Sequence, residues 1–147
     1  MAEEMRSVNI LLVEDNPDDV ILTKESLKEG KIKNTLYDVG DGVEAMEFLR
    51  QKGKYAGKPR PDIVFLDLNL PKKDGRQVLE EIKSDADLRT IPVVILTTSE
   101  AEEDVIKSYN LHANCYISKP VSLDRFIHVI KQMDEFWFDI VRLPKGC

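Results

Sequence analysis

The sequence has few cysteines, no long apolar run and no excess of basic residues, and each absence excludes a class of protein. Two cysteines in 147 residues, Cys115 and Cys147, cannot build the disulfide framework of a small secreted domain, and neither stands at a metal-ligand spacing. Their simplest interpretation is as free thiols in a reducing cytosol, which predicts a cytoplasmic location. The acidic N-terminus lacks an apolar signal core, and no apolar run is long enough to cross a membrane. We therefore expect neither export nor a membrane.

The charge balance argues against a nucleic-acid ligand. The formal net charge is −6 and the pI is about 5.0, whereas nucleic-acid binding needs a basic face. A chain of 147 residues is long enough to bury a core without disulfides and short enough for one domain. We therefore predict a single domain over residues 1–147 that meets a selected partner other than nucleic acid.

A short apolar run that ends in an acid is the most informative segment. Residues 63–68 read Ile-Val-Phe-Leu-Asp-Leu, and Asn69 and Pro71 follow. A run this short and rich in Val and Ile is typical of a strand buried on both faces, as in a parallel sheet. Asp67 then stands at the carboxyl edge of the sheet, where open α/β sheets bind their ligands. A turn-initiating aspartate is the alternative interpretation of this residue.

Strand signals and helix signals alternate along the chain. Four further short apolar segments predict strands, at residues 8–13, 36–39, 91–97 and 114–118. Helix signals follow the strands, at Asn16-Pro17, Asp41-Gly42, Asp74-Gly75, Ser99 and Ser122. Because the connections are too long for hairpins, right-handed βαβ crossovers and a parallel sheet are predicted.

Two local predictions are more detailed. On the first helix, one apolar stripe is expected to contain Val20, Ile21, Lys24 and Leu27. Residues 52–61 hold two glycines and two prolines among charged residues, which predicts an exposed loop without secondary structure.

Polar residues end four of the predicted strands. They are Glu14 and Asp15, Asp67, Thr97 and Lys119. Each has an ordinary structural interpretation, as a helix-capping acid, a loop aspartate, a strand-end threonine or a loop lysine. Together, at one edge of a parallel sheet, they predict a common site. Three close carboxylates repel one another and favour a hard divalent cation such as Mg²⁺. One carboxylate could then attack phosphorus, with the ammonium and the hydroxyl stabilising the phosphoryl oxygens.

Four short motifs contain these residues, and a fifth, Asp-Gly, lies shortly after Asp67. They read Val-Glu-Asp-Asn at 13–16, Leu-Asp-Leu-Asn-Leu-Pro at 66–71, Asp-Gly at 74–75, Leu-Thr-Thr-Ser at 96–99 and Tyr-Ile-Ser-Lys-Pro at 116–120. In combination they resemble the response-regulator receiver domain of two-component signalling. The resemblance implies a three-layer, doubly wound, flavodoxin-like α/β fold with a five-stranded parallel sheet of order 2-1-3-4-5. It covers a core at about residues 8–133 and leaves 134–147 as a C-terminal extension.

The same resemblance implies roles for the acidic residues. Asp67 would be the phosphoacceptor, and Glu14 and Asp15 the acidic pair of the metal site. Asp15 and Asp67 would bind Mg²⁺ together with the main-chain carbonyl of Asn69.

It also implies roles at the ends of the last two strands. Thr97 and Lys119 would contact the phosphoryl oxygens, and Tyr116 would be the switch aromatic whose rotamer follows Thr97. Thr98 departs from the Ala or Gly that is common at its position. A β-branched residue there would hinder the approach of water to the phosphoryl group.

A narrower resemblance concerns the partner. The segments at 66–76, 114–116 and 135–138 are similar to the small stand-alone regulators that serve bacterial phytochrome histidine kinases. This resemblance implies a sensor histidine kinase of phytochrome type as phosphoryl donor. Because no DNA-binding or enzymatic segment follows the final predicted helix, we expect the output to be contact with a downstream protein.

Two alternatives use the same residues differently. A haloacid-dehalogenase-type phosphatase also has an aspartate nucleophile after a buried strand, but it needs a second aspartate two positions on, where this chain has Asn69. A constitutive receiver-like adaptor would not need the complete set of site residues. We therefore expect a phosphoacceptor signalling protein that assists its own Mg²⁺-dependent phosphorylation and dephosphorylation, and not an enzyme.

The C-terminal extension predicts a homodimer. Its apolar residues are too many for one helix face to cover, and they include Phe136, Trp137, Phe138, Ile140 and Val141. Apolar patches of this kind usually mark interfaces, with aromatic residues as energetic anchors. The alternative is that this segment folds back over its own domain.

Overall fold

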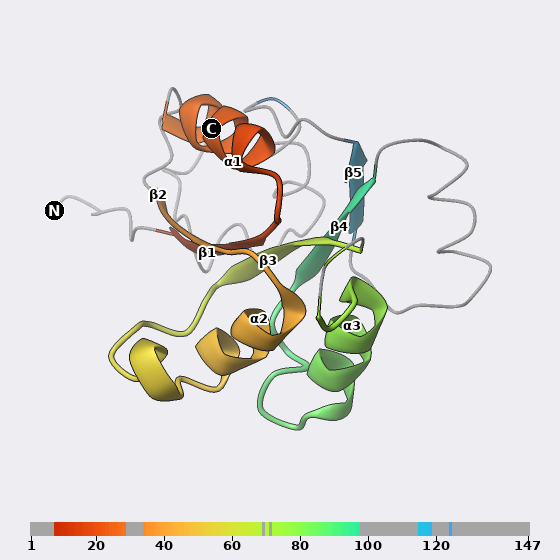
Figure 1. Ribbon diagram of the computed structural model, residues 1–147. Helices are drawn as coiled ribbons and strands as arrows, with labels where there is room; N and C mark the ends of the chain where they lie inside the picture. Colours follow the sequence, from red (N-terminus) through yellow and green to blue (C-terminus); the bar gives the residue numbers. More distant parts are fainter. Residues whose placement is uncertain are drawn as a thin grey trace, which may run out of the picture.

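A five-stranded parallel sheet is the centre of the computed structural model, which describes residues 8–28, 34–68, 70, 72–97, 115–118 and 124. Its order is β2-β1-β3-β4-β5 (Figure 1), which confirms the prediction. The strands are β1 (Val8–Val13), β2 (Asn34–Val39), β3 (Ile63–Asp67), β4 (Val93–Thr97) and β5 (Cys115–Ser118). The helices are α1 (Pro17–Lys28), α2 (Gly42–Leu49), α3 (Gly75–Ser84) and the short 3-10 helix η1 (Gly53–Tyr55). The helices predicted to start at Ser99 and Ser122 lie outside the described residues.

Helices cover both faces of the sheet. Helix α1 lies on one face, and α2 and α3 lie on the other (Figure 1). Since side chains alternate along a strand, Leu11 and Leu66 enter the core beneath α2 and α3, while Leu12 and Phe65 are equally buried on the opposite face. The two covered faces explain why these strands are uninterrupted apolar runs. Among the described residues, no helix has the length and apolar character that crossing a bilayer requires.

Strands β2 and β4 start two residues away from the predicted positions. Strand β2 starts at Asn34, because its six residues all pair with β1, beginning with Asn34 opposite Val8. Strand β4 starts at Val93 because the N–H of Ile91 is bonded to the carbonyl of Leu88, 2.9 Å away, in the preceding turn.

Helix α1 starts where the sequence predicts. The side-chain oxygen of Asn16 accepts hydrogen bonds from the N–H groups of Asp18 and Asp19, at 2.9 and 3.3 Å. Pro17 occupies the first helical position, where its missing N–H costs nothing.

The predicted stripe of α1 is wrong at one position. The buried residues are Val20, Thr23 and Leu27, whereas Ile21 is 57% exposed. A threonine can take the buried position because its hydroxyl donates to the carbonyl of Asp19, 2.8 Å away. The sequence pattern did not predict the burial of Thr23, because a search for apolar residues at helical spacing leaves out a threonine whose hydroxyl is hydrogen-bonded within the helix.

The prediction for residues 52–61 is right that most of the segment is exposed, but wrong that it holds no secondary structure, because it contains η1, whose Tyr55 packs against the core. The ring of Tyr55 lies 5.2 Å from that of Phe48, and the Tyr55 hydroxyl donates to Oε1 of Glu44 at 2.8 Å. The ammonium of Lys54 is 2.9 Å from the same oxygen. These two contacts attach the connection between α2 and β3 to α2.

Glu44 should therefore make stability depend on pH. The hydrogen bond from Lys54, followed by that from Tyr55, holds the pKa of Glu44 below its ordinary value. A carboxyl whose pKa is lower in the folded state stabilises the fold above its unfolded pKa, and this stabilisation is lost as the pH falls through the folded pKa.

We expect Glu44→Gln to lower the unfolding free energy at neutral pH by up to about 1 kcal/mol, since the group is partly exposed. The difference from the parent should shrink as the pH falls below the ordinary glutamate pKa, about 4.3, and the parent carboxyl takes up a proton. Thermal unfolding at both pH values measures it, with Glu47→Gln on the same helix as control. An equal loss at both pH values would contradict the assignment.

Candidate functional site

The register of the sheet brings two carboxylates to the same level. Leu12 pairs with Phe65, and Val13 pairs with Leu66. One residue further on, the chain reaches Glu14 from β1 and Asp67 at the end of β3. One carboxylate oxygen from each of Glu14, Asp15 and Asp67 lies within 4.8 Å of the other two. Within the described residues, this is the one cluster of acids, histidines and cysteines that could share a metal ion.

Burial separates the three acids. Glu14 and Asp67 are each only 3% exposed, while Asp15 is exposed. The N–H of Glu14 donates to the carbonyl of Val39 at 3.0 Å, and its Oε2 accepts from the N–H of Asn16 at 3.1 Å. Glu14 is therefore a buried member of the cluster rather than a surface helix cap, and Asn16 caps α1 instead.

The chain turns sharply after Asp67. The carbonyl of Leu68 accepts two backbone hydrogen bonds, from Leu70 at 3.2 Å and from Gly75 at 3.0 Å. These bonds bring the start of α3 close to the end of β3, so Asp67 is held at the junction of a strand and a tight loop. Asn69, the residue expected to offer a carbonyl to the metal, lies outside the described residues.

For two of the remaining predicted site residues, Thr97 and Tyr116, the structure gives the position of the backbone in a strand. Thr97 is the last residue of β4 and pairs with Ser118, which precedes Lys119 in the sequence. Tyr116 is in β5 and pairs with Ile95. Lys119 itself and the predicted dimer residues Phe136, Trp137 and Phe138 lie outside the described residues.

The donor set of the cluster fits a hard divalent cation. It offers carboxylate oxygens and no sulfur or imidazole, which is the chemistry that Mg²⁺, Mn²⁺ and Ca²⁺ prefer. Two of the carboxylates are buried, so their mutual repulsion is poorly screened by water. A cation bound there would offset their charge, and a further ligand could approach it from the solvent side, where Asp15 is exposed.

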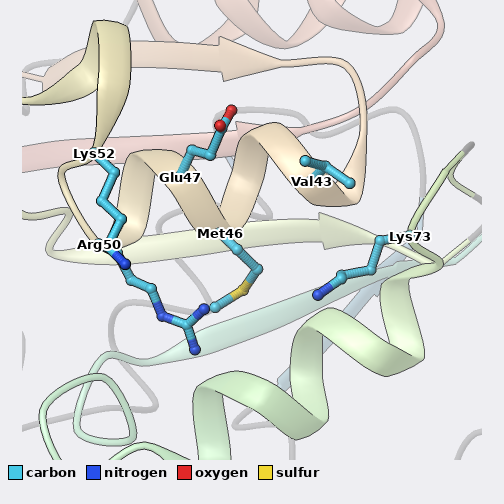
Figure 2. A pocket seen from close by; sticks show the side chains of 6 residues that line it. All are labelled: Val43, Met46, Glu47, Arg50, Lys52 and Lys73. Atoms are coloured by element: carbon cyan, nitrogen blue, oxygen red, sulfur yellow. The ribbon is translucent and has the colours of Figure 1, made fainter.

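A groove along α2, opposite the loop before α3, is separate from this cluster. Figure 2 shows Lys73, from the loop before α3, on the opposite side of the groove from the side chains of α2. Its volume is about 200 Å³, and its lining is mixed in charge, with Val43, Met46, Glu47, Arg50, Lys52 and Lys73. Glu81 of α3 pairs with both Arg50 and Lys73. The groove contains none of the three clustered acids, so the edge of the sheet is the site that the chemistry favours.

Comparison with known proteins identifies the family. The model of the response regulator receiver domain matches residues 10–131. The chain belongs to this family. Response regulator Rcp1 of Synechocystis sp. is 51% identical over 135 residues, which is 92% of each chain. The receiver prediction is confirmed.

Two solved receivers match in both sequence and fold. The phosphorylated cyanobacterial phytochrome response regulator RcpA is 50% identical with a TM-score of 0.73, over 95% of this chain and 99% of that one. The Mn²⁺-bound form of response regulator Rcp1 is 52% identical with a TM-score of 0.72, over 93% and 99%. These similarities confirm the flavodoxin-like receiver fold. Receivers function by phosphorylation of an aspartate, and a divalent metal binds in their acidic pocket.

Removing one acid from the cluster of this receiver should have opposite effects with and without metal. In a chelator, Asp15→Asn should raise the melting temperature because it relieves repulsion between close carboxylates. In millimolar Mg²⁺ the variant should lose the stabilisation that the ion gives the parent, about 1 kcal/mol at roughly five times Kd.

Calorimetric melting with chelator and with Mg²⁺ measures both effects. Asp18→Asn makes the same chemical change at an exposed acid in the first turn of α1, outside the cluster, and is the control. An ion-induced shift in Asp15→Asn as large as that of the parent would show that the cluster is not the metal site.

Proposed function

We propose that the chain is a response regulator in which Asp67 accepts a phosphoryl group from a histidine kinase. The observation that carries this proposal is the burial of Asp67 at the end of β3, within 4.8 Å of the oxygens of Glu14 and Asp15. A nucleophile on a central strand is held rigidly, and most of the acceleration of phosphoryl transfer comes from positioning and charge.

The transfer step involves one bond formed and one broken. A carboxylate oxygen of Asp67 attacks phosphorus, the P–O bond forms as the P–N bond of the phosphohistidine breaks, and the leaving imidazole nitrogen takes up a proton. Asp15, Asp67 and the carbonyl of Asn69 would hold Mg²⁺, with Glu14 completing the acidic pair. When bound, the ion supplies positive charge that offsets the carboxylates and the incoming phosphoryl oxygens.

On the other side of the phosphoryl group, the resemblance to the family assigns contacts to Thr97 and Lys119. The order of the strands supports this assignment. Thr97 ends β4 next to Asp67 on β3, since Leu96 pairs with Asp67. We assign to Thr97 a hydroxyl contact with a phosphoryl oxygen, and to Lys119 an ion pair with the phosphoryl charge. Tyr116 is the aromatic residue whose rotamer reports this contact.

The proposed donor is a sensor histidine kinase of the phytochrome type. The similarity to a regulator described as a cyanobacterial phytochrome response regulator, at 50% identity, supports this choice. The proposed output is contact with a downstream protein in the cytoplasm. The chain is then a phosphoacceptor that assists its own modification rather than an enzyme acting on a separate substrate.

Asp67→Asn should abolish phosphorylation, because the amide keeps the shape of the side chain but is not a nucleophile. Incubation with acetyl phosphate and Mg²⁺, followed by intact mass, should show one added phosphoryl group on the parent and none on the variant. Asp62→Asn is the matched control, since Asp62 precedes β3 at its other end and an Asn oxygen can still accept the hydrogen bond from the N–H of Asn9.

Equal uptake by parent and Asp67→Asn would move the acceptor to another residue. No uptake by the parent would favour the constitutive adaptor.

We also propose that the chain forms a homodimer through its C-terminal extension. The support is the concentration of apolar residues there, with Phe136, Trp137 and Phe138 as the expected anchors. A two-fold arrangement would suit a partner kinase that is itself a dimer.

Light scattering at micromolar concentration should give twice the chain mass for the full chain and a single chain mass after truncation behind Asp134. Because truncation removes many residues, the full-length Trp137→Ala variant should also weaken the dimer by at least tenfold in Kd, as loss of an aromatic anchor does. A monomeric mass for the full chain, with or without phosphorylation, would reject the dimer.

A further inference from the structure

The loop between β3 and α3 lies directly against the first turn of α2. A Cβ atom placed on Gly42 would lie 2.0 Å from the carbonyl oxygen of Lys73 and 2.7 Å from its carbonyl carbon. These distances are far inside van der Waals contact, and the colliding atoms are backbone, which cannot rotate away. The loop can occupy this place only because residue 42 has no side chain.

An ion pair holds the same loop from the same turn. Asp41 is 6% exposed, and its Oδ1 accepts the N–H of Glu44 at 2.8 Å to cap α2. Its other oxygen is 3.4 Å from the ammonium of Lys72. Lys72 has φ of +66°, a left-handed conformation that residues other than glycine rarely adopt. Such a conformation persists where the surroundings impose it.

The far end of the loop is equally close-packed. A Cβ atom on Gly75 would lie 2.5 Å from both the carbonyl oxygen of Asp67 and the Cα of Leu68. Lys73, seen reaching over the groove in Figure 2, also pairs with Glu81 of α3. The loop that leaves the phosphoacceptor is thus fixed by α2 on one side and by α3 on the other.

A side chain at residue 42 would displace the loop rather than the helix. Helix α2 is anchored by Ala45, Phe48 and Leu49, which are at most 3% exposed. The loop is more open to solvent, since the side chain of Lys72 is 69% exposed. Relief of a collision between the two would therefore come mainly from movement of the loop that follows Asp67.

We propose that Gly42 is a positioning residue for phosphoryl transfer, although it touches neither the metal nor the phosphoryl group. By leaving room for the backbone of Lys73, it sets the path of the loop between Asp67 and α3. This inference rests on the proposed function, in which Asp67 is the acceptor and the carbonyl of Asn69, in the same loop, binds Mg²⁺.

The test compares two glycines of one turn. Gly42→Ala should slow phosphorylation by acetyl phosphate about tenfold or more at saturating Mg²⁺, since small misplacements of reacting groups are costly. It should also weaken Mg²⁺ binding, measured by NMR titration. Gly40→Ala adds the same methyl group where a Cβ meets nothing within 4 Å, so it should leave both values unchanged.

A fall in melting temperature with an unchanged rate and unchanged Mg²⁺ affinity would make Gly42 merely structural and overturn the proposal. If Gly42→Ala does not fold, Asp41→Asn decides. Its amide oxygen still caps α2, but its charge no longer pairs with Lys72, so we expect a loss of about threefold in the same two measurements. Unchanged values in Asp41→Asn would then overturn the proposal.

The outcomes separate this inference from the function on which it rests. If the parent chain takes up no phosphoryl group at all, the proposed function fails. If the parent is phosphorylated on Asp67 and Gly42→Ala behaves like the parent, only the role of Gly42 fails.

Discussion

Repulsion among three carboxylates is the constraint on which the site depends. Glu14 and Asp67 are almost fully buried, and their oxygens lie within 4.8 Å of each other and of Asp15. Bringing buried like charges together is costly. The backbone sets their positions here, because each acid directly follows or ends a strand that is buried on both faces. The three clustered carboxylates therefore favour a divalent cation, which would offset their negative charge.

Much of this arrangement could be predicted from the sequence. The apolar runs ending in Glu14 and Asp67 gave both strands because a strand covered on both faces has no polar alternation to obscure it. The helix start at Pro17 followed from its cap. By contrast, the burial of Thr23 and the packing of Tyr55 were missed, because they depend on contacts that no periodicity encodes: a hydrogen bond to Asp19 for Thr23, and a hydrogen bond to Glu44 and a ring contact with Phe48 for Tyr55.

Sequence reasoning missed the packing that holds the loop after Asp67 in place. Gly42 was recognised only as a helix-start signal, yet its importance comes from the backbone of Lys73, 31 positions later in the chain. A glycine required by a tertiary contact looks the same in sequence as a glycine in a free turn, such as Gly40, next to which nothing lies within 4 Å. Only the structure distinguishes the two glycines, because Gly42 is required by the close approach of two backbone segments and not by a sequence motif.

The same packing bears on which elements would move after the proposed phosphorylation of Asp67. The loop after Asp67 is held from α2 by the Gly42 contact and by the pairing of Lys72 with Asp41, and from α3 by the pairing of Lys73 with Glu81. Elements fixed by backbone contact respond little to a new charge, since movement there requires a collision to be relieved first. Under the proposed function, a phosphoryl group on Asp67 would then be accommodated by groups on the other side of β3. Strand β4 is the neighbour of β3 on that side, and its last residue is Thr97. The close packing on the α2 side would thus direct the response to the proposed phosphorylation toward β4 and β5, where the proposal assigns roles to Thr97, Tyr116 and Lys119.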